Sequence, residues 1–269
     1  MTAITPRIDF SRELSGLFSL KGKTAYVTGG YGGIGEAIAW ALAMAGAKVA
    51  VSGRDAAKAG TLADELQRAG HEAFGVAMDA HSVASIRDSV DAVADKLGGL
   101  HILANCVGIQ REQKLLDVTE ETFDEVLQVN LKAAMFLAQA AAKHQIAAGG
   151  GAQLHLLSVR AQLGVRGRGY SAYCSTKGGL VMLIRQHASE LAPHGITVNG
   201  IAPTVVRTEM ARHWLENPET RAQVLGRIPL GRVADPKDVA GAAVFFASPA
   251  GSFVTGQVMY VDGGITASQ

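Results

Sequence analysis

The sequence predicts an α/β fold in which helices cover both faces of a doubly wound, seven-stranded parallel sheet. Short apolar runs alternate with longer helical patterns from residue 24 to the end of the chain. Most of these runs are nearly continuous in Val, Ile, Leu and Ala, which is typical of strands buried on both faces. Seven such runs joined by six helical patterns therefore indicate one doubly wound sheet.

The strands are expected at residues 24–28, 48–52, 72–77, 101–104, 153–158, 197–201 and 257–261. The helices are expected at residues 33–45, 55–69, 83–97, 120–147, 171–191 and 236–247. Residues 21–269 are predicted to form a single domain, since no repeat or change of composition divides them, and residues 1–20 an N-terminal arm. The segment 205–229 interrupts the alternation and is interpreted as a lid over the substrate.

Length, charge and cysteine content restrict the class of protein. The chain has 269 residues, of which 48% are hydrophobic, so it can bury a sizeable core. A net charge of +1 argues against nucleic acid or acidic membranes as partners. Two cysteines, dispersed histidines and the lack of a signal-like or membrane-spanning run predict a cytoplasmic protein without a metal site.

A glycine-rich loop, TGGYGGIG at residues 28–35, leads from the first strand into the first helix. Glycine allows a tight turn and a close approach of the backbone to a pyrophosphate, which then faces the amides at the helix N-terminus. The strand before and the helix after it are the context that such a motif needs, although glycines also serve ordinary turns. The dinucleotide site is therefore predicted to include Gly29, Tyr31, Gly33, Ile34 and Gly35.

The end of the second strand bears on the choice between NAD and NADP. Gly53 stands where an acidic residue would hold the ribose hydroxyls of NAD, and Arg54 could pair with a 2′-phosphate. Asp55 could act at the ribose, but it is interpreted as a cap of the next helix. These residues favour NADP(H). NAD(H) remains possible, because the glycine-rich loop has no basic residue and Arg54 could be a solvated side chain.

Two further strand ends contribute to the predicted cofactor site. Asp79, with Ala80 beside it, could accept a hydrogen bond from the adenine amino group or cap the following helix. Asn105 and Gly108 follow the fourth strand, where the chain would pass beneath the adenosine ribose.

Four residues are candidates for the chemistry. Tyr173 and Lys177 lie four residues apart in a predicted helix, so both can face one site. The Lys177 cation and an oxidised nicotinamide would both favour the phenolate and bring the pKa of Tyr173 toward the range for proton transfer. Ser158, at the end of the fifth strand, could hydrogen-bond the substrate oxygen. The amide of Asn130 could hold a water that links Lys177 to solvent, or make a packing hydrogen bond.

The sequence resembles the short-chain dehydrogenases/reductases over nearly its whole length. The matching motifs are TGGYGGIG (28–35), Asp79, NCVG (105–108), Asn130, Ser158, YCSTK (173–177), Pro203, Thr208 and VDGG (261–264). The resemblance implies that Asn130, Ser158, Tyr173 and Lys177 are catalytic and that Tyr173 and Lys177 contact the nicotinamide end. It also implies that the segment with Pro203, Val206 and Thr208 grips the nicotinamide carboxamide and the pyrophosphate, and that the protein is a homotetramer.

Three departures from the family pattern leave these groups in place. NCVG replaces the usual NNAG, Pro203-Thr204 replaces Pro-Gly, and the segment from Ser158 to Tyr173 is longer and contains Tyr170. Lys177 selects Tyr173 as the reactive tyrosine, because Tyr170 lies seven residues before it. Tyr170 is expected to line the substrate pocket instead.

Several stretches are similar to the sugar-acid branch of that family, the gluconate 5-dehydrogenases and 2-deoxy-gluconate 3-dehydrogenases. A small-molecule substrate with a secondary alcohol or ketone, a sugar acid or polyol, is expected. Arg111, Arg160 and Arg207 are candidates to bind its carboxylate, while Arg166 and Arg168 are expected to be solvated. A 3-oxoacyl or other ketone reductase and a non-catalytic dinucleotide sensor remain alternatives, because the fold alone does not define function.

Overall fold

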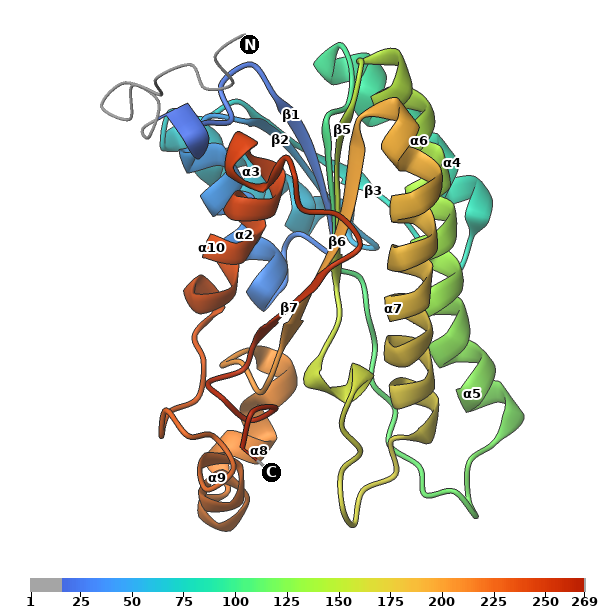
Figure 1. Ribbon diagram of the computed structural model, residues 1–269, viewed down its shortest axis with the longest axis vertical. Helices are drawn as coiled ribbons and strands as arrows, with labels where there is room; N and C mark the ends of the chain where they lie inside the picture. Colours follow the sequence, from blue (N-terminus) through green and yellow to red (C-terminus); the bar gives the residue numbers. More distant parts are fainter. Residues whose placement is uncertain (1–15, 269) are drawn as a thin grey trace, which may run out of the picture.

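The structure is a computed structural model that describes residues 16–268. It confirms the predicted parallel sheet, whose seven strands follow the order β3-β2-β1-β4-β5-β6-β7 (Figure 1). The strands are β1 (Thr24–Thr28), β2 (Lys48–Gly53), β3 (Ala73–Ala77), β4 (Ile102–Asn105), β5 (Gly151–Leu156), β6 (Ile196–Pro203) and β7 (Val258–Val261). The strand order reverses between β1 and β4, so a crevice forms at the carboxyl ends of these two strands.

Two layers of helices cover the sheet (Figure 1). One layer contains α2 (Gly33–Met44), α3 (Ala56–Arg68) and α10 (Pro236–Ala247). The other layer contains α4 (Val83–Leu97), α5 (Glu120–Leu127), α6 (Ala133–Ala147) and α7 (Ser171–Leu191). Two short helices, α8 (Arg212–Glu216) and α9 (Pro218–Leu225), lie beyond the carboxyl ends of the strands, within the segment predicted to be a lid.

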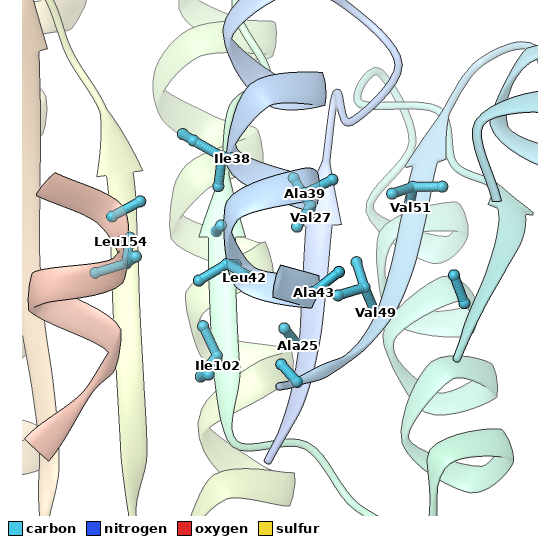
Figure 2. Close-up of a cluster of buried hydrophobic side chains, with 14 of the residues drawn as sticks. Ala25, Val27, Ile38, Ala39, Leu42, Ala43, Val49, Val51, Ile102 and Leu154 are labelled. Carbon is cyan, nitrogen blue, oxygen red and sulfur yellow. The ribbon is translucent and has the colours of Figure 1, made fainter. Parts of the chain in front are cut away.

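Small side chains bring α2 close to the sheet. Ala39 and Ala43 of α2 face Val27 of β1 and Val49 of β2 in the close-up of the core, and all are buried (Figure 2). Leu42 is fully buried beside them, a contribution of about 1.5–3 kcal/mol for a side chain of this size. This packing fixes the N-terminus of α2, and with it the glycine-rich loop, against the end of β1.

The N-terminal arm expected at residues 1–20 is described only from residue 16 onward, and residues 1–15 lie outside the described residues. Leu20 is fully buried, and its N–H donates to the carbonyl of Ala45 at 2.8 Å. Leu20 therefore belongs to the core. No helix between residues 16 and 268 has the length and hydropathy needed to cross a membrane.

The single helix predicted at residues 120–147 is wrong in one respect. A π-helical turn, Gln128–Lys132, separates α5 from α6. The apolar pattern runs through this turn without interruption, so the sequence does not reveal it. The turn places Asn130 on the buried side, next to the loop that follows β4.

Candidate active site

A cavity of about 590 Å³ opens at the carboxyl edge of the sheet, in the predicted crevice. Its walls come from the loop after β1, the ends of β2 to β6, the start of α7 and helix α9. The predicted cofactor residues that line it are Gly29, Tyr31, Gly33, Ile34, Gly35, Gly53, Arg54, Ala80, Gly108, Tyr173, Lys177, Pro203, Val206 and Thr208. One continuous cavity thus brings together most of the residues expected at opposite ends of a dinucleotide.

The glycine-rich loop has the geometry that a pyrophosphate requires. Gly29 adopts φ +66° and Gly33 φ +40°, which L-residues rarely adopt. A Cβ at Gly35 would lie 2.2 Å from the Gly29 carbonyl oxygen, and one at Gly33 would lie 2.5 Å from Thr208 Cγ2. Within the described part of the chain, no side chain caps the N-terminus of α2. The bare amides at this helix end therefore fit the phosphates of a dinucleotide.

The adenosine end of the cavity is lined by Gly53, Arg54, Ala80 and His81. As predicted, Asp55 caps a helix: its carboxylate accepts hydrogen bonds from two amides at the start of α3. The alternative that Asp79 caps the next helix is wrong, because the N-cap of α4 is Ser82.

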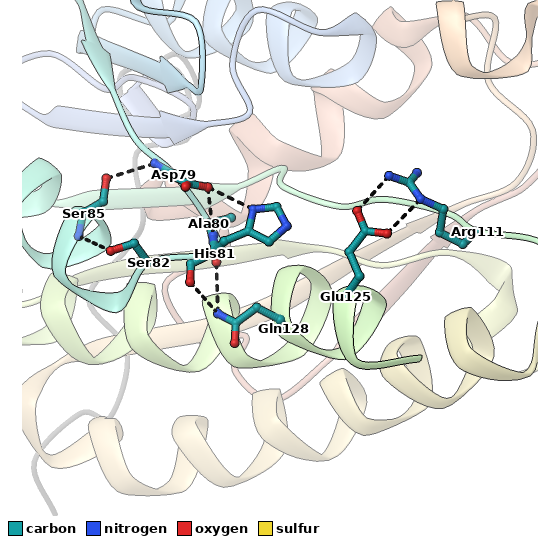
Figure 3. A network of polar contacts seen from close by, with 8 residues as sticks. All are labelled: Asp79, Ala80, His81, Ser82, Ser85, Arg111, Glu125 and Gln128. Atoms are coloured by element: carbon teal, nitrogen blue, oxygen red, sulfur yellow. Dashed lines mark hydrogen bonds and ion pairs between the residues drawn. The ribbon is translucent and has the colours of Figure 1, made fainter. Parts of the chain in front are cut away.

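The Asp79 carboxylate faces His81 and is not part of the cavity wall. It accepts from the His81 N–H and lies 3.0 Å from His81 Nδ1 (Figure 3). These hydrogen bonds hold the pKa of Asp79 below its ordinary value. The expected contact between Asp79 and adenine would need this carboxylate to turn.

Asn105 supports the cavity without lining it. Its Oδ1 accepts from Thr28 Oγ1 at 3.2 Å and from the Val107 N–H at 3.1 Å. Its amide nitrogen lies 3.3 Å from Nδ1 of His155, which is fully buried. Asn105 thereby joins the ends of β1, β4 and β5 beneath the loop that contains Gly108.

Tyr173 and Ser158 meet inside the cavity. Ser158 lies two residues beyond β5 and lines the same cavity, close enough to the Tyr173 hydroxyl to lower its pKa. Ser158 Oγ accepts from the Arg160 N–H at 3.2 Å, which fixes the direction of its side chain. Burial raises the pKa of Tyr173 to about 12, and the nearby Ser158 hydroxyl opposes this effect.

Lys177 lies one helical turn after Tyr173, with its Nζ 5.5 Å from the centre of the tyrosine ring. The Nζ donates to the Leu156 carbonyl at 2.8 Å, at the end of β5. Burial lowers the pKa of Lys177 to about 8. The sequence predicts a Tyr173 pKa that the Lys177 cation and an oxidised nicotinamide lower together. In the protein alone, burial of the phenol raises the pKa of Tyr173 instead.

Asn130 uses its whole side chain for protein contacts. Its Oδ1 accepts from the Ile109 N–H at 2.8 Å, and its Nδ2 donates to the Ile109 carbonyl at 2.9 Å and to Thr176 Oγ1 at 3.2 Å. Of the two roles considered for this amide, the structure therefore shows the packing hydrogen bond. The Asn130 side chain ties the loop after β4 to α7, and it does not line the cavity.

Two of the three candidate arginines lie outside the wall of the main cavity. Arg111 pairs with Glu125 through two contacts of 2.9 Å, and Arg207 pairs with Asp235 at 3.2 Å (Figure 3 shows Arg111). Neither lines the main cavity. Both guanidinium groups are already neutralised by a carboxylate on a neighbouring element.

Arg160 does line the cavity, and its Nη1 donates to the carbonyl of Gly164 at 3.0 Å.

Tyr170 lines the cavity as expected, edge-on to Tyr173 with ring centres 6.3 Å apart. Arg168 was expected to be solvated but also lines the cavity, because it is half-buried between Glu112 and the Tyr170 hydroxyl. Arg166 is exposed and borders the cavity as well. The longer segment between Ser158 and Tyr173 thus contributes three arginines to the cavity wall, of which Arg168 is paired with Glu112.

A family model described as enoyl-(acyl carrier protein) reductase matches residues 29–266, nearly nine-tenths of the chain. The chain belongs to the short-chain dehydrogenase/reductase family. The resemblance stated from its motifs is thereby confirmed.

Several relatives within this family match over almost their full length. Gluconate 5-dehydrogenase of Gluconobacter oxydans is 36% identical over 252 residues, which cover 94% of this chain and 98% of the relative. D-threitol dehydrogenase of Mycolicibacterium smegmatis is 38% identical, with 93% and 95% covered. The crystal structure of a gluconate 5-dehydrogenase from Burkholderia cenocepacia, in complex with NADP and tartrate, superposes with a TM-score of 0.92 at 34% identity, with 95% and 100% covered.

One wall of the cavity in this short-chain dehydrogenase/reductase lies in the segment 205–229 that was interpreted as a lid, although its individual residues were not predicted. It is formed by α9 and the residues just after it, through Thr220, Gln223, Val224 and Arg227. Their spacing of three, four and seven residues defines one helix face, a signal that was present in the sequence. The side chains of this helix face are mostly polar, so no apolar pattern marks it in the sequence. A helix face that lines a ligand cavity need not be apolar.

Proposed function

We propose that this protein is an NADP(H)-preferring oxidoreductase that interconverts a secondary alcohol and a ketone on a sugar acid or polyol. The observation that carries the proposal is the Tyr173 side chain, which lines a cavity of about 590 Å³ together with Ser158 and lies one helical turn from Lys177. The names of the relatives support the substrate class, since they act on gluconate and threitol.

In the reducing direction, the Tyr173 hydroxyl donates its proton to the carbonyl oxygen of the substrate. A bound nicotinamide supplies the hydride that the carbonyl carbon takes up. Ser158 orients the same oxygen and, because it is anchored by the Arg160 N–H, needs little reorganisation as negative charge develops there. The Lys177 ammonium then stabilises the phenolate that remains. In the oxidising direction, the phenolate removes the proton from the alcohol.

Arg160 is proposed to bind the carboxylate of a sugar-acid substrate. Its guanidinium borders the same cavity as Tyr173 and is held in place by carbonyls of its own loop. Burial lowers the pKa of Arg160, so an anionic ligand would restore part of the stabilisation that the charge loses on leaving water. A neutral polyol would offer no such compensation, and we therefore favour the acid as substrate.

Tyr173→Phe tests the proposal, with Tyr170→Phe as the matched control in the same cavity. Turnover of gluconate, 5-keto-gluconate and D-threitol with NADP(H) and NAD(H) is compared with dinucleotide affinity measured by fluorescence. We expect Tyr173→Phe to lower kcat by about 10²–10⁴-fold and to leave the affinity for NADPH unchanged. Wild-type binding of dinucleotide without turnover of any of these compounds or of a 3-oxoacyl ester would favour the sensor instead.

The outward face of the α5–α7 layer is proposed to join protomers into a homotetramer. Large apolar side chains are exposed there, namely Phe123, Leu127, Met135 and Met182. Such a concentration on one helical layer is more typical of an interface between copies than of a solvent-facing surface.

A further inference from the structure

The ring of Tyr31 covers Gly53 at the adenosine end of the cavity. A Cβ at Gly53 would lie 2.3 Å from Tyr31 Cε1, 2.6 Å from Cζ and 2.7 Å from Oη. The ring is held at both ends, because it packs against the core cluster of α2 and the Tyr31 hydroxyl accepts the N–H of Asp55 at 3.1 Å. Position 53 therefore has no room for a side chain while Tyr31 stays in place.

The two carboxylates near this end of the cavity each accept hydrogen bonds from neighbouring groups through one oxygen. Asp55 accepts two amides of α3, and Asp79 accepts from His81. Across the described residues that line this end, the charged or titratable side chains are Arg54 and His81. Position 53, where an acidic side chain would accept from the two ribose hydroxyls of NAD, is a glycine.

The Tyr31 hydroxyl remains available as a donor. A phenol oxygen can accept one hydrogen bond and donate another, and the Asp55 N–H already uses the accepting side. Among residues 16–268, the Asp55 N–H is the one hydrogen-bond partner of Tyr31 Oη. Its proton therefore suits a ligand acceptor, and a phosphate oxygen next to Arg54 is such an acceptor.

We propose that Tyr31 determines the preference for a 2′-phosphate, by excluding an acidic side chain from position 53 and by donating its hydroxyl proton to that phosphate. This inference rests on the proposed preference for NADP(H) and assigns it to one residue. The Tyr31 ring then requires glycine at position 53. This glycine also leaves space for the phosphate.

Binding of adenosine fragments tests this independently of turnover. The ratio of the Kd of 5′-AMP to that of 2′,5′-ADP, measured by calorimetry on the full chain, reports the 2′-phosphate alone. Tyr31→Phe keeps the ring and removes the donor, so we expect the ratio to fall about tenfold, as for one hydrogen bond to a charged group. The affinity for 5′-AMP should change less than about twofold.

A second set of variants tests the exclusion of an acid. Gly53→Asp alone should weaken both fragments and lower the Tm, because the new side chain meets the Tyr31 ring. The double variant Tyr31→Ala with Gly53→Asp should recover the Tm and bind 5′-AMP about tenfold more tightly than Gly53→Asp alone. Gly60→Asp is the charge control, since a Cβ there meets nothing within 4 Å. It should leave the ratio unchanged.

Two results would overturn the inference while NADP(H) preference survives. One is an unchanged fragment ratio in Tyr31→Phe. The other is a gain of 5′-AMP affinity in Gly53→Asp that equals the gain in the double variant. A wild-type protein that binds 5′-AMP as tightly as 2′,5′-ADP would instead contradict the proposed cofactor preference itself.

Discussion

At the scale of single residues, burial dominates the electrostatics of the site. Tyr173 and Lys177 are both shifted toward their neutral forms, the tyrosine to a pKa of about 12 and the lysine to about 8. Burial therefore disfavours the phenolate of Tyr173 and the ammonium of Lys177, the two charged forms that the proposed reaction uses. The positive charge of an oxidised nicotinamide would favour the phenolate, and we therefore expect proton transfer from the alcohol to require the bound dinucleotide.

The buried Lys177 should make stability depend on pH. Its pKa is about 8 in the folded chain and about 10.5 when exposed, so between these values the unfolded chain binds more protons and stability rises with pH. The full difference corresponds to about 3 kcal/mol. We expect denaturant unfolding at pH 7 and pH 10 to show a gain in the wild type that Lys177→Met lacks.

Lys143→Met, on the exposed side of α6, serves as the control for loss of a positive charge. It should retain the pH dependence of the wild type. Parallel pH profiles for the wild type and Lys177→Met would mean that the Lys177 ammonium is well solvated in the folded protein.

At the scale of elements, the π-helical turn distinguishes the structure from its prediction. The turn at Gln128–Lys132 directs Asn130 toward Ile109 and Thr176, so three segments that are distant in sequence meet at one amide. Gln128 of the same turn donates to the carbonyls of Ala80 and His81 (Figure 3). One irregular turn therefore links the adenosine and chemical ends of the cavity.

Helix α9 offers a test of the proposed lid. Asn217 caps this helix by accepting the Thr220 N–H at 3.0 Å. Asn217→Ala should cost about 1 kcal/mol of local stability. We expect KM for the alcohol substrate to rise while the Kd for NADPH is unchanged. A matched rise in both constants would indicate that α9 supports the dinucleotide as well.

At the scale of the whole molecule, the proposed assembly predicts which exposed side chains matter. Met182 on α7 is 58% exposed and Met44 on α2 is 73% exposed, on opposite helical layers. If the α5–α7 layer joins protomers, Met182→Glu should dissociate the assembly because a carboxylate is costly to bury. Met44→Glu should not. Light scattering after size-exclusion chromatography measures both, and a monomeric wild type would refute the assembly.

The sequence by itself determined the seven-stranded parallel sheet, the glycine-rich loop and the pairing of Tyr173 with Lys177. These depend on local patterns, namely apolar runs, glycines in tight turns and residues four apart on a helix. The tertiary structure decided what depends on neighbours distant in sequence. Arg111 and Arg207 pair with Glu125 and Asp235 outside the cavity wall. Arg168 and α9, in contrast, form part of that wall. The same long-range packing set the pKa values of Tyr173 and Lys177, because desolvation depends on everything that surrounds a side chain.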